Sequence, residues 1–200
     1  MDKIKIAFDL DNVCVNTTEC ILQYINERLP VNLKMTDITS YSIESALPEE
    51  YKWIVESGFR DKQMWKKVKL LPQCANFIYT LYCEGYDIYF ATSSLPENLR
   101  KKINHLSRNM QFFPEGYIEK RTINISDKYL LNVDILVDDC LDHIANTKRN
   151  YWSIVLDYPW NRDRATIEQP HIIRVTDWNR IYLAIHTITD ILKREENDDV

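Results

Sequence analysis

The strongest constraint on the fold is a pattern, repeated three times, in which a short apolar segment is followed at once by polar side chains. The polar residues are Asp9 and Asp11 after residues 3–8, Thr92 and Ser93 after residues 86–91, and Asp138 and Asp139 after residues 134–137. Each apolar segment has the length and composition of a buried β-strand. Ligands of an open parallel sheet bind outside the carboxyl ends of its strands, so we expect these side chains to converge there.

Helical segments alternate with the strands along the chain. Residues 16–29 carry apolar side chains at helical spacing, and a helix over residues 94–110 is predicted to begin with Ser94 and Glu97 as a capping box. Further elements are predicted as a helix at residues 141–149, strands at 152–156 and 171–175, and an amphipathic helix at 178–192. This alternation predicts an α/β fold with a doubly wound parallel sheet.

One interval is too long for this scheme. A crossover helix with its turns needs about 30 residues, whereas residues 9–85 separate the first two predicted strands. The surplus contains helix-like pieces at residues 48–56 and 61–68. We therefore expect a core formed by residues 1–16 and 73–200, with a small helical cap, residues 17–72, inserted after the first strand.

The net charge and the apolar segments restrict the partners and the location. A formal net charge of −5 repels an extended polyanion, so a long nucleic acid is not an expected partner. The start of the chain is too short and too acidic for a signal-peptide core, and no segment approaches the ~20 apolar residues of a membrane span. We expect a cytoplasmic protein without membrane contact, and the sequence leaves its oligomeric state open.

Two further groups of residues are interpreted without a special function. Five cysteines, an odd number without metal-binding spacing, are expected to be reduced and mostly buried. The basic runs at residues 66–69 and 100–102 are interpreted as solvated helix faces.

The converging polar residues indicate a phosphate site with a metal ion. Several carboxylates in one cleft disfavour ionisation of one another unless a cation neutralises them, and Mg²⁺ is held by one or two carboxylates together with substrate phosphate. Thr92 and Ser93 add hydroxyl donors beside the N-terminus of the next helix, which favours an anion. Lys128, shortly before the 134–137 strand, adds a positive charge that can stabilise a phosphoryl group in transfer.

The order of these residues resembles the four motifs of the haloacid dehalogenase superfamily: Asp9-x-Asp11-x-Val13, then Thr92, then Lys128, then Asp138-Asp139. The resemblance implies a Rossmann-like core. It implies that Asp9 is the nucleophile that forms an aspartyl-phosphate, and that Asp11 is the general acid and then the base. It also implies that Mg²⁺ is held by Asp9, the main-chain carbonyl of Asp11 and Asp139, with Asp138 as the second candidate. Asn12 stands where the family commonly has Gly, and Asn tolerates a left-handed backbone better than most residues.

Within that superfamily the chain most resembles the 5′(3′)-deoxyribonucleotidases. The resemblance rests on the cap position, on residues 92–94 (TSS), on residues 127–139 (DKYLLNVDILVDD) and on residues 158–162 (YPWNR). It implies dephosphorylation of a nucleoside monophosphate whose base lies against cap aromatics. The aromatic candidates are Tyr41, Tyr51, Trp53, Phe59 and Trp65. Of these, Trp53 and Trp65 are expected to contact the substrate.

Three alternatives are weighed against this interpretation. A response-regulator receiver domain also combines carboxylates, Thr and Lys around Mg²⁺, but its acidic pair comes first in the chain, whereas Asp138-Asp139 comes last here. A non-catalytic relative that keeps the fold for binding is disfavoured by the intact Asp9 and Asp11. The same chemistry on another small phosphate ester, or on a polynucleotide 3′-phosphate, stays open, and the acidic net charge weakens the polynucleotide version.

Overall fold

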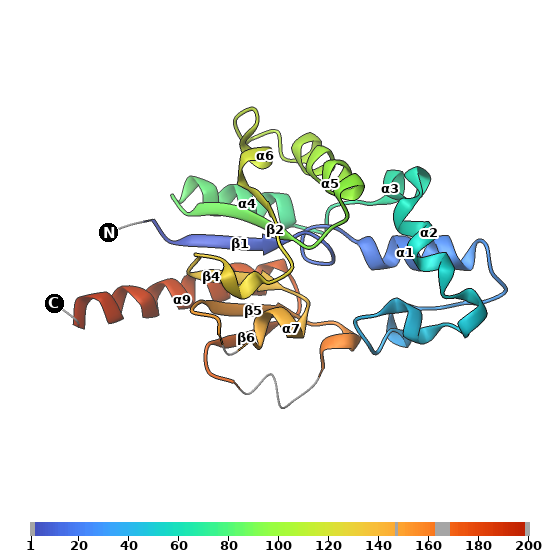
Figure 1. The fold of residues 1–200 in the computed structure, drawn as a ribbon. Coiled ribbons are helices and arrows are strands. Elements are labelled where there is room, and N and C mark those ends of the chain that lie inside the picture. The colour runs from blue at the N-terminus through green and yellow to red at the C-terminus, as the bar shows by residue number, and fades with distance from the viewer. Residues whose placement is uncertain (1–2, 147, 163–168, 199–200) are drawn as a thin grey trace.

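The computed structural model describes residues 3–146, 148–162 and 169–198. Within these residues, six parallel strands form one sheet in the order β3-β2-β1-β4-β5-β6 (Figure 1). The strands are β1 Lys5–Asp9, β2 Asp87–Thr92, β3 Thr122–Asn124, β4 Ile135–Asp138, β5 Trp152–Leu156 and β6 Ile172–Val175. The helices are α1 Thr17–Asn26, α2 Trp53–Arg60, α3 Lys62–Lys67, α4 Cys74–Cys83, α5 Pro96–Asn109, α6 Tyr117–Arg121, α7 Leu141–Ile144 and α9 Trp178–Asp198. The α/β fold with a parallel sheet is confirmed.

The two faces of the sheet are covered differently because side chains alternate along each strand. Ile6 and Phe8 of β1 belong to the large apolar core, into which α4 and α9 pack. Ala7 faces the opposite side, in a smaller cluster with residues that follow the short 3₁₀ helix η4 (Lys128–Leu130). Both faces of β1 are therefore covered, which fixes the position of the residue at its carboxyl end.

Helices α1, α2 and α3, which follow β1 in the chain, lie together beyond the carboxyl ends of the strands (Figure 1). Helix α1 packs against both α2 and α3. Gly58 allows the close approach of α1 and α2, because a Cβ at this position would lie 3.0 Å from Tyr24 Cδ1 and 3.1 Å from Ile21 Cδ1. Three short 3₁₀ helices, η1 Met35–Asp37, η2 Ile43–Ala46 and η3 Glu49–Tyr51, complete the insertion. The predicted helical insertion after the first strand is present.

Three local predictions are corrected. Strand β3 is absent from the prediction because its three residues are too few to show a periodic pattern. The helix predicted over residues 141–149 ends at Ile144. The predicted capping box is wrong: Leu95 is the N-cap of α5 without a side-chain bond. The backbone N–H of Ser94 instead donates to Asn124 Oδ1 at 2.9 Å, which turns Ser94 away from the helix start.

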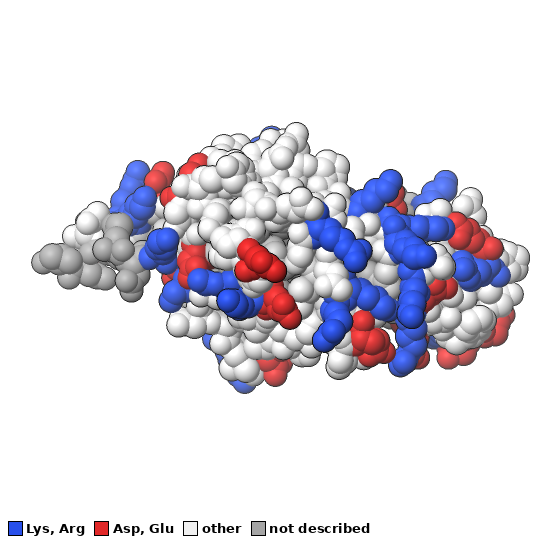
Figure 2. All heavy atoms as spheres, turned by 90° about the horizontal axis from the view of Figure 1, so that it is seen from above, with Lys and Arg blue, Asp and Glu red and all other residues white. Residues whose placement is uncertain are grey.

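The predictions for the cysteines and for the basic runs hold at most positions. All five cysteines are free thiols, and four of them are buried. Among the helices of the described residues, none combines the length and the apolar character of a bilayer crossing. Figure 2 shows Lys and Arg side chains gathered around α3 and α5. Lys66 and Arg100 are exposed there, as predicted, but Lys102 is buried, and the interpretation of residues 100–102 as a solvated face fails at this position.

Candidate active site

Three carboxylates meet at the carboxyl ends of β1 and β4. Asp9 is the last residue of β1, Asp138 is the last residue of β4, and Asp139 follows it. Because the two strands are neighbours in the sheet, one oxygen from each side chain lies within 4.8 Å of the others, and all three residues are buried. The structure therefore brings together two of the three strand ends of the sequence pattern around one cluster of hard oxygen atoms.

Lys128 neutralises two of these carboxylates. Its Nζ lies 2.6 Å from Asp9 Oδ1 and 2.6 Å from Asp138 Oδ2, and the residue is only 1% exposed. Burial lowers the pKa of Lys128, but the carboxylates of Asp138 and Asp9 outweigh that effect and raise the pKa above its ordinary range. The lysine is therefore charged at neutral pH and fixed beside Asp9.

Asp138 is saturated by donors. Its Oδ1 accepts from the backbone N–H of Cys140 at 2.9 Å, and its Oδ2 lies 2.9 Å from His143 Nδ1 in addition to Lys128. Burial raises the pKa of Asp138, but the Lys128 ammonium and the His143 hydrogen bond hold that pKa well below its usual range. Asp138 is consequently ionised and serves as an anchor for Lys128 and His143.

Asp139 differs because one of its oxygens has no donor. Oδ2 accepts from Asn12 Nδ2 at 3.0 Å, whereas Oδ1 is buried without a hydrogen-bond partner among the described residues. Burial, followed by the negative charges of Asp138 and Asp9, raises the pKa of Asp139 well above its usual range. Burial likewise raises the pKa of Asp9, to about 6. An unpartnered buried carboxylate oxygen within a crowded acidic cluster fits a divalent cation, whose charge would lower these pKa values.

The loop after β1 holds this geometry through Asn12. Asn12 has a φ of 58°, in the left-handed region, as expected for a position where relatives commonly have Gly. Its Oδ1 accepts from the backbone N–H of Thr18, while its Nδ2 donates to Asp139. The Tyr158 hydroxyl donates to the Asn12 carbonyl at 2.8 Å, and Asn161 Nδ2 donates to the Asp139 carbonyl at 2.8 Å. Residues 158–162 (YPWNR) thus hold both the loop after β1, which carries Asn12, and the loop after β4, which carries Asp139.

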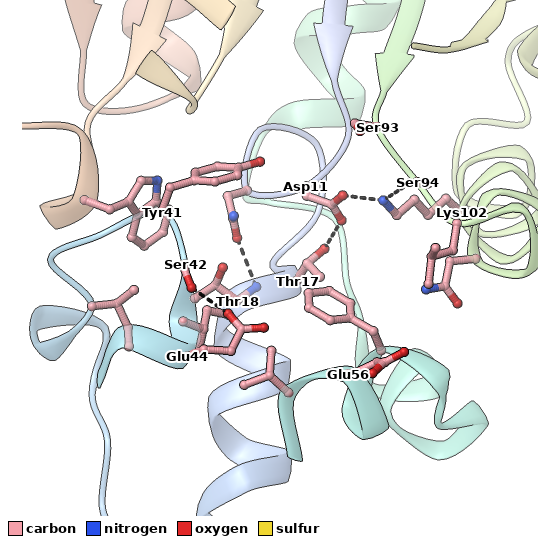
Figure 3. Close-up of a pocket in the computed structure, with 18 residues that line it drawn as sticks. Asp11, Thr17, Thr18, Tyr41, Ser42, Glu44, Glu56, Ser93, Ser94 and Lys102 are labelled. Atoms are coloured by element: carbon pink, nitrogen blue, oxygen red, sulfur yellow. Dashed lines mark hydrogen bonds and ion pairs between the residues drawn. The ribbon is translucent and has the colours of Figure 1, made fainter. Parts of the chain in front are cut away.

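Asp11, Thr92 and Ser93 lie beside the acidic cluster rather than within it. Figure 3 shows the Asp11 carboxylate directed toward Thr17 and Lys102, with Thr17 Oγ1 at 2.5 Å from Asp11 Oδ1. The Asp11 side chain is absent from the group of carboxylates that could share a cation. Thr92, the last residue of β2, is fully buried, and the Ser93 hydroxyl lies 3.1 Å from that of Ser126.

A cavity of about 550 Å³ opens above these residues, between the core and the inserted helices (Figure 3). Its core side includes Asp11, Ser93, Ser94, Asn98, Lys102 and Trp160, and its other side includes Ile38, Tyr41, Ile43, Glu44, Val55 and Phe59. Volumes of roughly 300–1,000 Å³ are usual for small-molecule sites, so the cavity has room for a nucleotide-sized ligand.

Two of the five aromatic candidates from the sequence, Tyr41 and Phe59, line this cavity, but the two preferred ones do not. Trp53 is 61% exposed and lies outside the cavity, and Trp65 also does not line it. The indole N–H of Trp65 donates to the Phe59 carbonyl at 2.7 Å, which directs its ring toward the core helix α5. Phe59 and Tyr41 line the cavity instead. Substrate contact by Trp53 and Trp65 stays a prediction, and the cavity favours Phe59 and Tyr41 for that role.

Tyr41 reaches from the insertion toward the carboxylates. Figure 3 shows its ring extending toward the loop that carries Asp11. The residue as a whole is 56% exposed, but burial of its hydroxyl and the nearby charges of Asp139 and Asp9 raise its pKa above its ordinary range. The phenol is therefore protonated and able to donate a hydrogen bond beside the acidic cluster.

Lys102 is the polar residue of the site that the sequence did not reveal. It is 5% exposed, and its Nζ contacts Asp11, Thr92 and Ser94. A signal was present in the helical spacing, because Asn98, Lys102 and Leu106 are four residues apart and all three are buried.

Comparison with known proteins agrees with this geometry. The model of the family "5′ nucleotidase, deoxy (Pyrimidine), cytosolic type C protein" matches residues 2–190. A protein of Staphylococcus epidermidis named "Putative 5′(3′)-deoxyribonucleotidase" is 25% identical over 142 residues, which are 70% of this chain and 75% of the relative. A protein of the same name from Staphylococcus aureus strain Mu50 is 26% identical over the same shares.

Solved structures show the same fold at low identity. A haloacid dehalogenase family hydrolase from Deinococcus radiodurans, with bound phosphate and sodium, has a TM-score of 0.66 and 13% identity, over 94% of this chain and 96% of that one. A haloacid dehalogenase-like hydrolase from Streptococcus pneumoniae has a TM-score of 0.61 and 15% identity, over 92% and 97%. The chain has the fold of the haloacid dehalogenase-like hydrolases. It belongs to the cytosolic type C 5′-nucleotidase family, and it is a phosphomonoesterase of the 5′-nucleotidase type.

Proposed function

We propose that this enzyme dephosphorylates nucleoside and deoxynucleoside monophosphates with Mg²⁺, through an aspartyl-phosphate on Asp9. The observation that carries the proposal is the buried cluster in which Asp9 contacts Lys128, while Asp139 Oδ1 has no hydrogen-bond partner in the part of the chain that the structure describes. In this proposal residues 1–16 and 73–200 form the catalytic core, and residues 17–72 form the cap. The family description supports a cytosolic location.

The cation would be held by Asp9, Asp139 and the main-chain carbonyl of Asp11. Asp139 is preferred over Asp138 because Asp138 already accepts from Lys128, Cys140 and His143. Mg²⁺ favours oxygen ligands and supplies charge that offsets the repulsion between carboxylates and phosphate.

The residues of this chain divide the reaction as follows. Asp9 attacks the phosphorus atom, and the bond between phosphorus and the leaving oxygen breaks as Asp11 gives that oxygen a proton. Lys128 and the Thr92 hydroxyl hold the charge of the phosphoryl group in transfer. Asp11 then takes a proton from water, which attacks the aspartyl-phosphate, releases phosphate and restores the Asp9 carboxylate.

The cavity supports a nucleoside monophosphate as substrate. Its core side places Ser93 beside the acidic cluster, and its cap side offers Phe59 and Tyr41 for the base. Stacking of a base on an aromatic ring contributes about 1–3 kcal/mol, enough to favour nucleotides over sugar phosphates. Glu44 and Glu56 also line the cavity, and their negative charges disfavour a second phosphate group.

A substrate panel tests the proposal. Phosphate release is measured with ribo- and deoxyribonucleoside 5′- and 3′-monophosphates, with glycerol 2-phosphate, and with matching nucleoside diphosphates. We expect turnover of monophosphates that EDTA or Asp9→Asn abolishes and that excess Mg²⁺ restores only after EDTA. Turnover that survives both EDTA and Asp9→Asn contradicts the mechanism, and preference for glycerol 2-phosphate over every nucleotide contradicts the substrate.

A further inference from the structure

Lys102 is a buried cation whose role in the reaction is not assigned above. An ammonium group has three donors, and the three described partners of Lys102 are Asp11 Oδ2, Thr92 Oγ1 at 3.2 Å and Ser94 Oγ. The side chain is 5% exposed, and a charge is tolerated at that depth only when it is paired. These three contacts fix the position of Lys102. Its one carboxylate partner among them is Asp11, the proposed general acid and base.

The Asp11 carboxylate is held at both oxygens. Oδ1 accepts from the Thr17 hydroxyl at 2.5 Å, from the start of α1, and Oδ2 accepts from Lys102 on α5. Figure 3 shows the two contacts reaching the carboxylate from different directions, Lys102 from the right and Thr17 from below. With Lys102 removed, Thr17 alone would not fix the plane of the carboxylate, and the carboxylate would lose its nearest positive charge.

Trp65 of α3 lies against the same lysine. Lys102 Nζ is 5.8 Å from the centroid of the Trp65 ring, within the range of a cation–π contact, and both side chains border one small internal gap with Leu106. Trp65 is 8% exposed, and its indole N–H is fixed by the Phe59 carbonyl. A residue of the inserted helices that does not reach the substrate cavity therefore contacts the cation that holds Asp11.

We propose that Lys102 is a positioning residue that fixes the Asp11 carboxylate for proton transfer, and that Trp65 keeps Lys102 in place. This inference rests on the proposed function of the site. Under this proposal, the packing of α3 against the core through Trp65 is required for proton transfer and not for substrate binding.

The competing explanation is that Lys102 binds the substrate phosphate directly. The two explanations differ in their dependence on the leaving group. An alkyl ester, such as a nucleotide or glycerol 2-phosphate, leaves as a strongly basic oxygen that needs a proton, whereas p-nitrophenolate leaves without one. A positioning residue of Asp11 therefore lowers kcat/KM selectively for the alkyl esters, because kcat/KM reports the steps up to departure of the leaving group. Hydrolysis of the aspartyl-phosphate, in which Asp11 acts as the base, is common to all the esters and affects their kcat alike. A phosphate ligand instead lowers kcat/KM for all the esters alike.

The test measures kcat and KM of Lys102→Met with thymidine 5′-monophosphate, glycerol 2-phosphate and p-nitrophenyl phosphate at saturating Mg²⁺. We expect kcat/KM for the alkyl esters to fall about 100-fold, mostly in kcat, because general acid catalysis is worth at least that much. For p-nitrophenyl phosphate we expect a loss of less than about 3-fold. Trp65→Phe, which keeps an aromatic ring, should show the same selectivity with a smaller loss, and it carries the test if Lys102→Met does not fold.

Lys101→Met is the matched control. Lys101 is the neighbouring residue of α5, its Nζ is also 5.8 Å from the Trp65 ring, and it donates to Asn98 instead of Asp11. We expect Lys101→Met to leave both kinds of ester unaffected. Equal losses of kcat/KM for all three esters in Lys102→Met, or no loss of kcat/KM for any of them, would overturn the inference.

The wild-type enzyme separates this inference from the proposed function. If it cleaves glycerol 2-phosphate but no nucleotide, the proposed substrate is wrong, and the selectivity of Lys102→Met is measured on glycerol 2-phosphate instead. If it releases phosphate from none of the three esters, the proposed function fails and this inference fails with it.

Discussion

Replacing Asp9, the proposed nucleophile, by Asn should stabilise the metal-free protein while it abolishes turnover. Burial, opposed by Lys128 and reinforced by Asp138, raises the pKa of Asp9 from an ordinary 3.8 to about 6. At about 1.4 kcal/mol per pKa unit, this difference in pKa means that ionising Asp9 costs roughly 3 kcal/mol more in the folded protein than in the unfolded chain. Asn resembles the protonated carboxyl group, so Asp9→Asn removes that cost. The charged form of Asp9, the proposed nucleophile, therefore lowers the free energy of unfolding of the metal-free protein.

The sign of the pH dependence follows from the two states of the chain. Below about pH 4 the carboxyl group is protonated in the folded and the unfolded protein, and its ionisation costs no stability. Between about pH 4 and pH 6 the unfolded chain loses the proton while the folded protein keeps it, so stability falls as the pH rises. Above about pH 6 the cost is complete, and the advantage of Asp9→Asn is constant.

Urea denaturation in EDTA, followed by tryptophan fluorescence at pH 4.5 and pH 8, measures this effect. We expect Asp9→Asn to exceed the wild type in free energy of unfolding by about 3 kcal/mol at pH 8 and by only about 1 kcal/mol at pH 4.5, where most unfolded chains but few folded ones have lost the proton. Asp190→Asn is the control, because Asp190 is exposed on α9, and it should change stability by less than about 0.5 kcal/mol at either pH. A variant that is less stable at pH 8, or equally stabilised at both pH values, would refute the reasoning.

Three further predictions concern the metal, the loop after β1 and the cavity. Asp139→Asn should remove the rise in melting temperature that MgCl₂ gives the wild type, because the unpartnered Oδ1 is lost as an anionic ligand; an unchanged rise would exclude Asp139 as a ligand. Asn12→Ala should cost about 1–3 kcal/mol in urea denaturation, because it leaves Asp139 without its donor and places Ala at a φ of 58°; a neutral result would contradict this role. Phe59→Ala should raise KM for nucleotides about 10-fold with little change in kcat, whereas Trp53→Ala should leave both constants unchanged; the reverse pattern would restore the original expectation for Trp53.

The sequence was informative where a residue type and its place in the chain had one explanation. Asp9, Thr92 and Asp138 end the strands as predicted, because apolar runs of four to six residues between polar segments define buried strands closely. Asn12 was predicted to accept a left-handed backbone and does so.

The sequence was uninformative where a long-range contact decides the environment of a residue. Lys102 lies in a run of three basic residues, and only the arrival of Asp11 and Trp65 from other segments makes its burial favourable. Ser94 has the spacing of a capping residue, but Asn124 on the unpredicted strand β3 binds its backbone. The sequence does not distinguish Trp53 and Trp65 from the other aromatic residues of the insertion. The packing of α2 and α3 on α1 decides which of these rings face the cavity.

The central claim is that Asp9 receives the phosphoryl group, and a phosphate mimic tests it most directly. Crystals of the wild-type enzyme are grown with MgCl₂ and beryllofluoride, which forms a stable analogue of an aspartyl-phosphate. We predict a beryllofluoride group bonded to Asp9, with the cation contacted by Asp139 and with Lys128 within hydrogen-bond distance of the fluorine atoms. An unmodified Asp9 beside a bound cation, or an adduct on another carboxylate, would contradict the account.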